Sequence, residues 1–205
     1  MKTATVFLVD DEPEMLKTLT RLLRARGFTV CAFSSACEFA MAYQPIDPSC
    51  LVLDVAMPGI NGLELQRRLT RDGVLLPIVF LTGHGDIPMS VRAIKAGAVD
   101  FLTKPVDHAD LMRAVRAALE RSVAQAAEHA EVADLSARLA SLTPREREVL
   151  EHVIAGKLNK QIAADLGTSE QTIKIHRMHV TAKLGIVSAV ELARAAQRLG
   201  VKPAT

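Results

Sequence analysis

The sequence predicts an α/β domain with a five-stranded parallel sheet, then a long helical linker, then a small all-α domain of four helices. Two observations predict this. Short apolar runs alternate with segments of helical period in the first half of the chain, and glycines separate helical segments near its end. Runs that are apolar throughout are typical of strands covered on both faces, as in parallel sheets with helical crossovers.

The five expected strands are rich in Val, Ile, Leu and Phe. They cover residues 5–9, 28–32, 50–54, 77–81 and 99–102. Helical periodicity predicts helices at 13–26, 35–43, 62–71 and 87–96, and a fifth that begins near residue 107. This alternation favours one parallel sheet with a helix after each strand.

The linker is expected to be helical. Residues 109–142 contain neither Gly nor Pro, and residues of high helix propensity dominate them. We expect the fifth helix to continue to about residue 138 as a semi-rigid arm. The alternative is a broken helix with a flexible joint in "RSVAQAAEHAE", because an isolated helix with little apolar stripe is only marginally stable. The expected domain bounds are 1–120, 121–140 for the linker, and 141–205.

Each of the last four helices is expected to begin at a capping residue and to end at a glycine. A capping box of Thr143 and Glu146, with Pro144 between them, begins the first. The other expected N-caps are Asn159, Ser169, and Ser188 with Glu191. Only Gly167 and Thr168 join the second helix to the third, which is the short turn of a helix-turn-helix.

Composition and charge limit the class of protein. The composition, 49% hydrophobic and 23% charged, is ordinary for a globular protein. No apolar run reaches the roughly 18 residues that span a bilayer, and the N-terminus lacks an export signal, so we expect no membrane association and a cytoplasmic location. Residues 1–141 hold 15 basic and 17 acidic side chains, whereas residues 142–205 hold 10 and 6, a balance suited to a polyanion.

The three cysteines are expected to be reduced. Cys31, Cys37 and Cys50 are odd in number, and their spacing fits neither a paired disulfide framework nor a CxxC metal site. We interpret them as core or near-core residues.

Polar residues follow four of the predicted strands. Asp10 and Asp11 follow the first, Asp54 ends the third, Thr82 follows the fourth, and Lys104 follows the fifth. The carboxyl ends of parallel strands meet at one edge of a sheet, so these side chains should converge there. Carboxylates that crowd together stay ionised most readily beside a cation, and hard oxygen ligands favour Mg²⁺. The sequence therefore predicts a magnesium site.

These residues resemble those of the receiver domains of two-component response regulators. The resemblance covers residues 4–120 and rests on "LVDDE", "LVLDVAMPGINGLEL", "FLTGHGD" and "DFLTKP". The stretch "LTGHGDIPMSVRAIKAGAVDFLTKP" is similar to the FixJ type in particular. The resemblance implies a flavodoxin-like (βα)5 fold and a sensor histidine kinase as partner.

The resemblance also implies roles for single residues. Asp54 would accept a phosphoryl group, Lys104 would supply a fixed positive charge, and Thr82 would bind a phosphoryl oxygen. Phe101 would change rotamer when Thr82 moves. The bond between Lys104 and Pro105 is expected to be cis, a form that X-Pro bonds adopt at low cost.

The implied metal ligands are Asp10, Asp11, Asp54 and the backbone carbonyl of Ala56, with Asp10 acting through water. Ala56 and His84 would border the water that attacks in dephosphorylation. We expect Ala56 to leave this opening unobstructed, where relatives often carry a long side chain.

Residues 140–200 resemble the LuxR-type helix-turn-helix. The resemblance rests on "LTPREREVLEHVIAGKLNKQIAADLGTSEQTIKIHRMHVTAKLG". It implies that the helix from about 170 to 184 enters the major groove of DNA. The residues expected at base edges are Lys174, Ile175 and Met178. The residues expected at phosphates are Lys160, Thr172, His176, Arg177 and Lys183. We expect Glu146 to pair with a basic residue inside the domain.

Together these features predict a transcription factor that phosphorylation switches, and not an enzyme beyond slow self-dephosphorylation. Its expected partners are promoter DNA and a second copy of the chain on activation, with RNA polymerase as a further candidate. One alternative is a Mg²⁺-dependent phosphohydrolase, but that class carries a DxD nucleophile loop after its first strand. The other alternative is a constitutive DNA-binding regulator with a phosphorylation-independent receiver.

Overall fold

The computed structural model describes residues 3–83 and 87–204. The chain divides into two compact units, Met1–Ala127 and Glu128–Thr205, and the boundary between them lies inside one long helix. The domain bounds expected from the sequence stay predictions. Within the described residues, no helix combines the length and the apolar character that crossing a bilayer requires.

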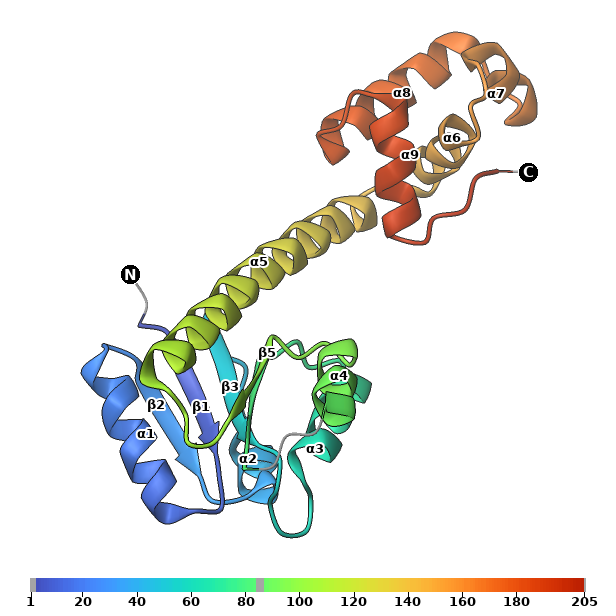
Figure 1. Cartoon of the computed structure of the whole chain (residues 1–205). Helices are drawn as coiled ribbons and strands as arrows, with labels where there is room; N and C mark the ends of the chain where they lie inside the picture. The colour runs from blue at the N-terminus through green and yellow to red at the C-terminus, as the bar shows by residue number, and fades with distance from the viewer. Residues whose placement is uncertain (1–2, 84–86, 205) are drawn as a thin grey trace. The chain divides into compact units, whose positions relative to one another are not determined.

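The first unit contains the predicted parallel sheet (Figure 1). Its strands, in the order β2-β1-β3-β4-β5, are β1 (Thr5–Val9), β2 (Thr29–Phe33), β3 (Ser49–Asp54), β4 (Ile78–Thr82) and β5 (Asp100–Thr103). Three strands begin one residue later than expected. At β4 the reason is plain, because Pro77 has no N–H to donate to a ladder. At β2, the N–H of Phe28 instead closes a turn onto the carbonyl of Leu23, at 3.2 Å.

Helices cover both faces of the sheet (Figure 1). They are α1 (Pro13–Ala25), α2 (Ala36–Ala42), α3 (Gly62–Arg71), α4 (Ile87–Lys95) and α5 (His108–Ala140). Helices α1 and α5 pack on one face of the sheet and form one core with it. Helices α2, α3 and α4 form a second core on the other face. Burial on both faces explains why the strand sequences are apolar throughout.

Helix α5 is assigned as one helix over His108–Ala140, so the prediction of a helical linker is confirmed. The helix ends at Ala140, two residues beyond the expected end. Its first turns bury Leu111 and Val115 against the sheet. Its last turns belong to the second unit, where Leu139 packs on the core and Arg138 donates a 3.3 Å hydrogen bond to the carbonyl of Leu184.

The second unit consists of the end of α5 and four short helices (Figure 1). These are α6 (Pro144–Ile154), α7 (Asn159–Asp165), α8 (Glu170–Leu184) and α9 (Ala189–Arg198). They enclose a core whose fully buried members are Val149, Leu150, Ile162 and Ile173. The predicted capping box of α6 is present: Thr143 and Glu146 each bond the other's backbone N–H with a side-chain oxygen.

One of the predicted caps is wrong, and a second is at its predicted position without a side-chain bond. Asn159 is the first residue of α7, because Leu158 occupies the N-cap and Gln161 accepts from the Leu158 N–H at 2.8 Å. The Asn159 side chain instead accepts from Arg177 of α8, at 2.8 Å. At α9, Ser188 stands at the N-cap but makes no side-chain capping bond.

The cysteines are free thiols, as predicted. Cys50 is fully buried, and burial raises its pKa to about 12. Cys31 is half-buried beside the second core. The expectation for Cys37 is wrong: it lies on the exposed side of α2, whose buried positions are Ala36 and Phe39.

Candidate functional site

Three carboxylates meet at the carboxyl edge of the sheet. Strands β1 and β3 are hydrogen-bonded neighbours, so the residues that end them lie side by side. Oxygen atoms of Asp10, Asp11 and Asp54 all lie within 4.8 Å of one another. Asp10 is 0% exposed and Asp54 is 2% exposed, whereas Asp11 is half-buried. The sequence therefore placed these three acids together correctly.

Lys104 reaches this cluster from the end of β5. Its ammonium nitrogen lies 2.8 Å from Asp10 Oδ2, 3.0 Å from Glu12 Oε1 and 3.3 Å from Asp54 Oδ1. Burial opposes the charged ammonium, but the hydrogen bonds and charges of these acids outweigh it and raise the pKa of Lys104. Lys104 is therefore a permanent cation at neutral pH.

Asp54 carries an unusual electrostatic environment. Burial raises its pKa, and the charge of Asp10 adds to this effect, while Lys104 and a backbone hydrogen bond from Ala56 oppose it. The net result is a raised pKa. The positive charge of Lys104 therefore offsets only part of the cost of burying the Asp54 carboxylate.

The site fits a divalent cation. Asp10 Oδ2 and Asp54 Oδ1 are buried. Among the described residues, both form an ion pair with Lys104. Three carboxylates against one buried ammonium leave negative charge in excess. A hard cation bound by oxygen ligands would balance that excess, which matches the predicted Mg²⁺.

Thr82 and Phe101 lie on the strands beside Asp54. Asp54 on β3 pairs with Leu81 on β4, so Thr82, the next residue of β4, lies close to Asp54. Thr82 is 2% exposed. The Lys104 N–H donates to the Thr82 carbonyl at 2.6 Å, which links the ends of β4 and β5. Phe101 is half-buried, with its ring 6.0 Å from that of Phe80. The predicted cis bond between Lys104 and Pro105 is present.

The start of α3 fixes the backbone of Asp54. A Cβ atom at Gly62 would overlap with the carbonyl oxygen of Asp54, and the Gly62 N–H donates to the Val55 carbonyl at 3.1 Å. Only glycine therefore permits this close approach. Ala56 is exposed, and His84 lies outside the described residues.

One residue of the site escaped the sequence analysis. The sequence did not predict that Glu12 contacts Lys104 at 3.0 Å. The Glu12 backbone N–H also donates to Asp10 Oδ1 at 2.9 Å. Glu12 and Lys104 lie far apart in the sequence, so no local pattern predicts this contact.

The second unit presents α8 as a candidate recognition helix. Lys160, Lys174, Ile175 and Met178 are exposed, and the two apolar members are 43% and 59% exposed respectively. Thr172, His176 and Arg177 are half-buried. An exposed apolar side chain can contact a thymine methyl group in the major groove, and the basic side chains beside it can contact the phosphates of the DNA backbone.

Lys183 is held inside its own unit. Its ammonium lies 2.7 Å from Glu146 Oε2 and donates to the Ser141 carbonyl at 3.2 Å. The hydrogen bond from Lys183, together with the one from the Thr143 N–H, lowers the pKa of Glu146 to about 2. The predicted internal partner of Glu146 is therefore Lys183, and this pairing orients Lys183 beside the α6 N-terminus.

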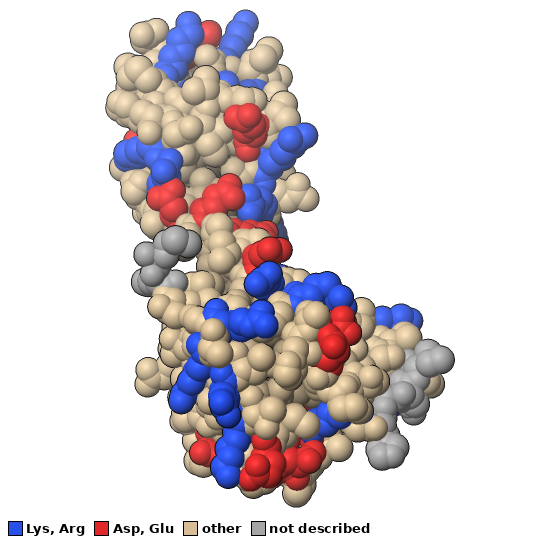
Figure 2. Space-filling model, turned by 60° about the vertical axis from the view of Figure 1, so that its left-hand side comes forward, with Lys and Arg blue, Asp and Glu red and all other residues tan. Residues whose placement is uncertain are grey.

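On the face that Figure 2 shows, charge alone does not mark a DNA-binding surface. Figure 2 shows basic and acidic side chains interspersed over the visible surface of the α6–α9 unit. The helix-turn-helix geometry, rather than a single basic patch, identifies α8 as the candidate element.

Comparison with known families matches both units. Residues 6–116 match the response regulator receiver domain, and residues 140–196 match the bacterial regulatory proteins of the luxR family. Nodulation protein W of Bradyrhizobium diazoefficiens is 46% identical over 97% of this chain and 87% of its own length. The transcriptional regulatory protein FixJ of Azorhizobium caulinodans is 43% identical over 97% of this chain and 94% of its own.

Solved structures give the same result. The response regulator StyR is 42% identical, with a TM-score of 0.81 over 96% of this chain and 100% of that one. Full-length FixJ from B. japonicum is 40% identical, with a TM-score of 0.59 over 98% of each chain. The chain therefore belongs to the response regulators of two-component systems, as a FixJ-type transcription factor with a receiver domain and a LuxR-type DNA-binding domain.

Proposed function

We propose that Asp54 accepts a phosphoryl group from a sensor histidine kinase and that this modification controls promoter binding. The observation that carries the proposal is the buried cluster of Asp10, Asp11 and Asp54 with Lys104 inside it. A structural ion pair needs one acid, whereas three acids beside one lysine suit a site that binds a divalent cation and, with it, a phosphoryl group.

The chemistry follows from the positions of the side chains. An ionised Asp54 oxygen attacks phosphorus, the P–N bond of the phosphohistidine donor breaks, and its electron pair returns to the imidazole. Lys104 holds its proton throughout and faces the developing charge. Thr82, which is buried at the next strand end, is proposed to donate its hydroxyl to a phosphoryl oxygen.

The proposed Mg²⁺ ligands are Asp10, Asp11, Asp54 and the backbone carbonyl of Ala56. When bound, the ion neutralises charge on the transferring phosphoryl oxygens. The chain itself contributes the fixed placement of these ligands, because β1, β3 and the Gly62 contact hold their backbone in place.

Phosphorylation is proposed to act through Thr82 and Phe101. A phosphoryl group adds nearly two negative charges and three acceptor oxygens, which favours an inward position of Thr82 and space for Phe101 to change rotamer. The proposed output surface is α4, β5 and the first part of α5, through which two copies pair. Val91 and Ile94 support this surface, since they are 43% and 45% exposed on α4.

The DNA contacts are proposed from the placement of α8. The residues at base edges are Lys174, Ile175 and Met178. The residues at phosphates are Lys160, Thr172, His176, Arg177 and Lys183. Two paired copies would present two recognition helices to a palindromic promoter site in the cytoplasm, and RNA polymerase is the proposed next partner.

Self-dephosphorylation is proposed to depend on Ala56. Its small, exposed side chain leaves the approach to Asp54 open to water. An Ala56→Arg variant is expected to lose its phosphoryl group more slowly than wild type, measured as the decay of phosphorylated protein by intact mass. An unchanged decay rate would refute this role.

The decisive experiment is selection of operator DNA from a random pool, with and without beryllofluoride. Wild type should enrich one palindromic sequence much more strongly with the mimic, and Asp54→Ala should not respond. Equal enrichment by wild type in both conditions would instead support the constitutive regulator.

A further inference from the structure

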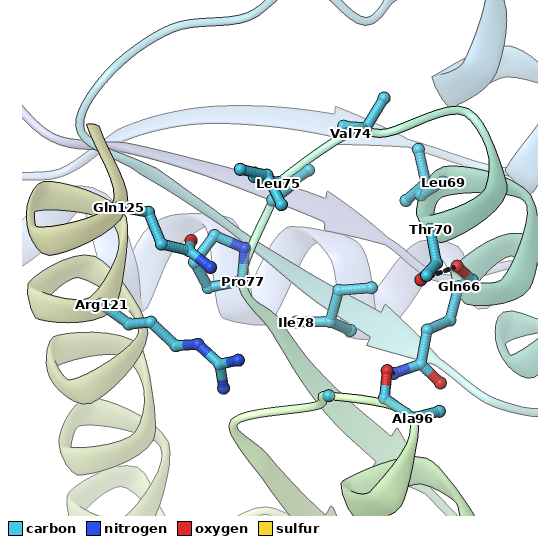
Figure 3. A pocket seen from close by; sticks show the side chains of 12 residues that line it. Gln66, Leu69, Thr70, Val74, Leu75, Pro77, Ile78, Ala96, Arg121 and Gln125 are labelled. Atoms are coloured by element: carbon cyan, nitrogen blue, oxygen red, sulfur yellow. Dashed lines mark hydrogen bonds between the residues drawn. The ribbon is translucent and has the colours of Figure 1, made fainter. Parts of the chain in front are cut away.

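A cavity of about 210 Å³ lies at the edge of the sheet opposite to Asp54. Its walls are the end of α3, the loop into β4, the turn between α4 and β5, and one side of α5 (Figure 3). Ile78, at the start of β4, lines it, whereas Thr82 ends the same strand at the acidic cluster. Four residue steps separate the two sites by about 13 Å.

One wall of the cavity is apolar. Its apolar lining consists of Leu69, Val74, Leu75, Leu76, Pro77 and Ile78. Figure 3 shows Leu75 and Ile78 within this lining, and Leu75 is 49% exposed. Covering such surface with an apolar group would be favourable, at about 25 cal/mol for each Å² removed from water.

The opposite end of the cavity is polar. Arg121 and Gln125, one turn apart on α5, extend into the space in Figure 3. Among the described residues, the exposed Arg121 has no ion-pair partner within 4.0 Å, and the buried Gln125 Oε1 accepts no hydrogen bond. A buried acceptor left without a donor is costly, so this end is incomplete in the chain alone.

Hydrogen bonds between α3 and the end of α4 hold the wall that faces α5 in place. Gln66 is 3% exposed, and its side-chain nitrogen donates to the carbonyls of Ala93 and Ala96, both at 3.3 Å. The Thr70 hydroxyl donates to the Gln66 carbonyl at 3.0 Å. These bonds join α3 to the end of α4, so this wall of the cavity is formed before any ligand arrives.

We propose that this cavity binds a small carboxylic acid that has an apolar ring or branched body and a hydroxyl group. The carboxylate accepts from the Arg121 guanidinium, whose planar fork matches two oxygen atoms. The hydroxyl donates to Gln125 Oε1, and the body lies against the apolar wall that includes Leu75 and Ile78. The volume is sufficient, because an apolar cavity of about 150 Å³ already holds benzene.

The site is independent of phosphoryl transfer. Its residues share no side chain with the acidic cluster, and its apolar wall disfavours a bare phosphate, which has no body to cover Leu75 and Ile78. The single charge of Arg121 matches one carboxylate. The ligand class is therefore set by the cavity alone.

The test is a titration of the ¹⁵N-labelled full chain with 3-hydroxybenzoate, benzoate and benzamide, followed by amide and side-chain NMR signals. We expect saturable shifts at Ile78, Ala96 and the Gln125 side chain, with affinity falling in that order of probes. Benzamide lacks the carboxylate for Arg121, and benzoate lacks the hydroxyl for Gln125.

Two matched variants separate the site from general charge. Arg121→Met should weaken 3-hydroxybenzoate binding about tenfold or more, the loss expected for a charge-assisted hydrogen bond. Arg116→Met, on the same helix but outside the cavity, should bind as wild type does. Absence of saturable shifts in wild type, or equal loss in both variants, would overturn the proposal.

Discussion

Replacing Lys104 with methionine tests the electrostatics of the acidic cluster. The substitution keeps most of the side-chain length but removes the ammonium that lies 2.8 Å from Asp10 and 3.3 Å from Asp54. Both acids are almost fully buried, so solvent cannot replace the lost charge. The contact with Glu12 matters less, because that side chain is 62% exposed.

The magnitude follows from these distances. At an effective dielectric constant of about 20, each of the two buried contacts has a Coulomb energy of about 5 to 6 kcal/mol before desolvation is counted. Removing one partner from a buried ion pair has a measured net cost of about 3 to 5 kcal/mol. We expect the lower end, about 3 kcal/mol, because Asp54 already has a raised pKa and takes up a proton readily.

The assay is urea unfolding followed by tyrosine fluorescence at pH 7 in EDTA. The chain has one tyrosine and no tryptophan, and Tyr43 packs against Phe39 in the first unit, so the signal reports that unit alone. The matched control is Lys17→Met, which removes an exposed 3.0 Å pair with Glu14 and should change stability by less than about 1 kcal/mol.

The pH dependence gives a second check. The raised pKa of Lys104 means that its contribution is fully present at pH 7 and is lost only in strong alkali. In acid the cluster becomes protonated, and the difference between Lys104→Met and wild type should shrink. A loss at pH 7 no larger than that of Lys17→Met would refute the reasoning.

Three further predictions concern other contacts. Asp54→Asn should raise the urea midpoint of unfolding at pH 7 in EDTA, because burial raises the pKa of Asp54 and so destabilises its charged form. This gain in stability should fade toward pH 4. Mg²⁺ should stabilise wild type more than the variant. Glu146 has its pKa lowered from 4.5 to about 2, so the helicity of its unit should weaken as the pH falls through this window, and Glu146→Gln should remove that dependence. Gly62→Ala should destabilise the first unit by about 1 to 3 kcal/mol in urea, whereas Gly83→Ala, whose Cβ atom would meet no described atom within 4 Å, should not.

The sequence was most informative where burial dictates residue type. Strands covered on both faces must be apolar throughout, so the parallel sheet could be read directly, and with it the edge at which Asp10, Asp54 and Lys104 converge. The same holds for α5, because the absence of Gly and Pro over 109–142 leaves the helix nothing to break it.

Features that depend on three-dimensional placement were not predictable. Asn is a residue type that often caps helices, but the Asn159 side chain accepts a hydrogen bond from Arg177 of another helix. Glu12 contacts a lysine far along the chain, and no local pattern specifies that distance. The cavity beside Arg121 likewise depends on how α3, α4 and α5 leave space between them.

The central claim is that Asp54, among its neighbouring acids and Lys104, is the phosphoryl acceptor. The most direct measurement is the intact mass of the full chain after incubation with acetyl phosphate and Mg²⁺. Wild type should gain the mass of one phosphoryl group that hydroxylamine removes, and Asp54→Ala should gain none. An unmodified wild type, or a phosphorylated Asp54→Ala chain, would contradict the account.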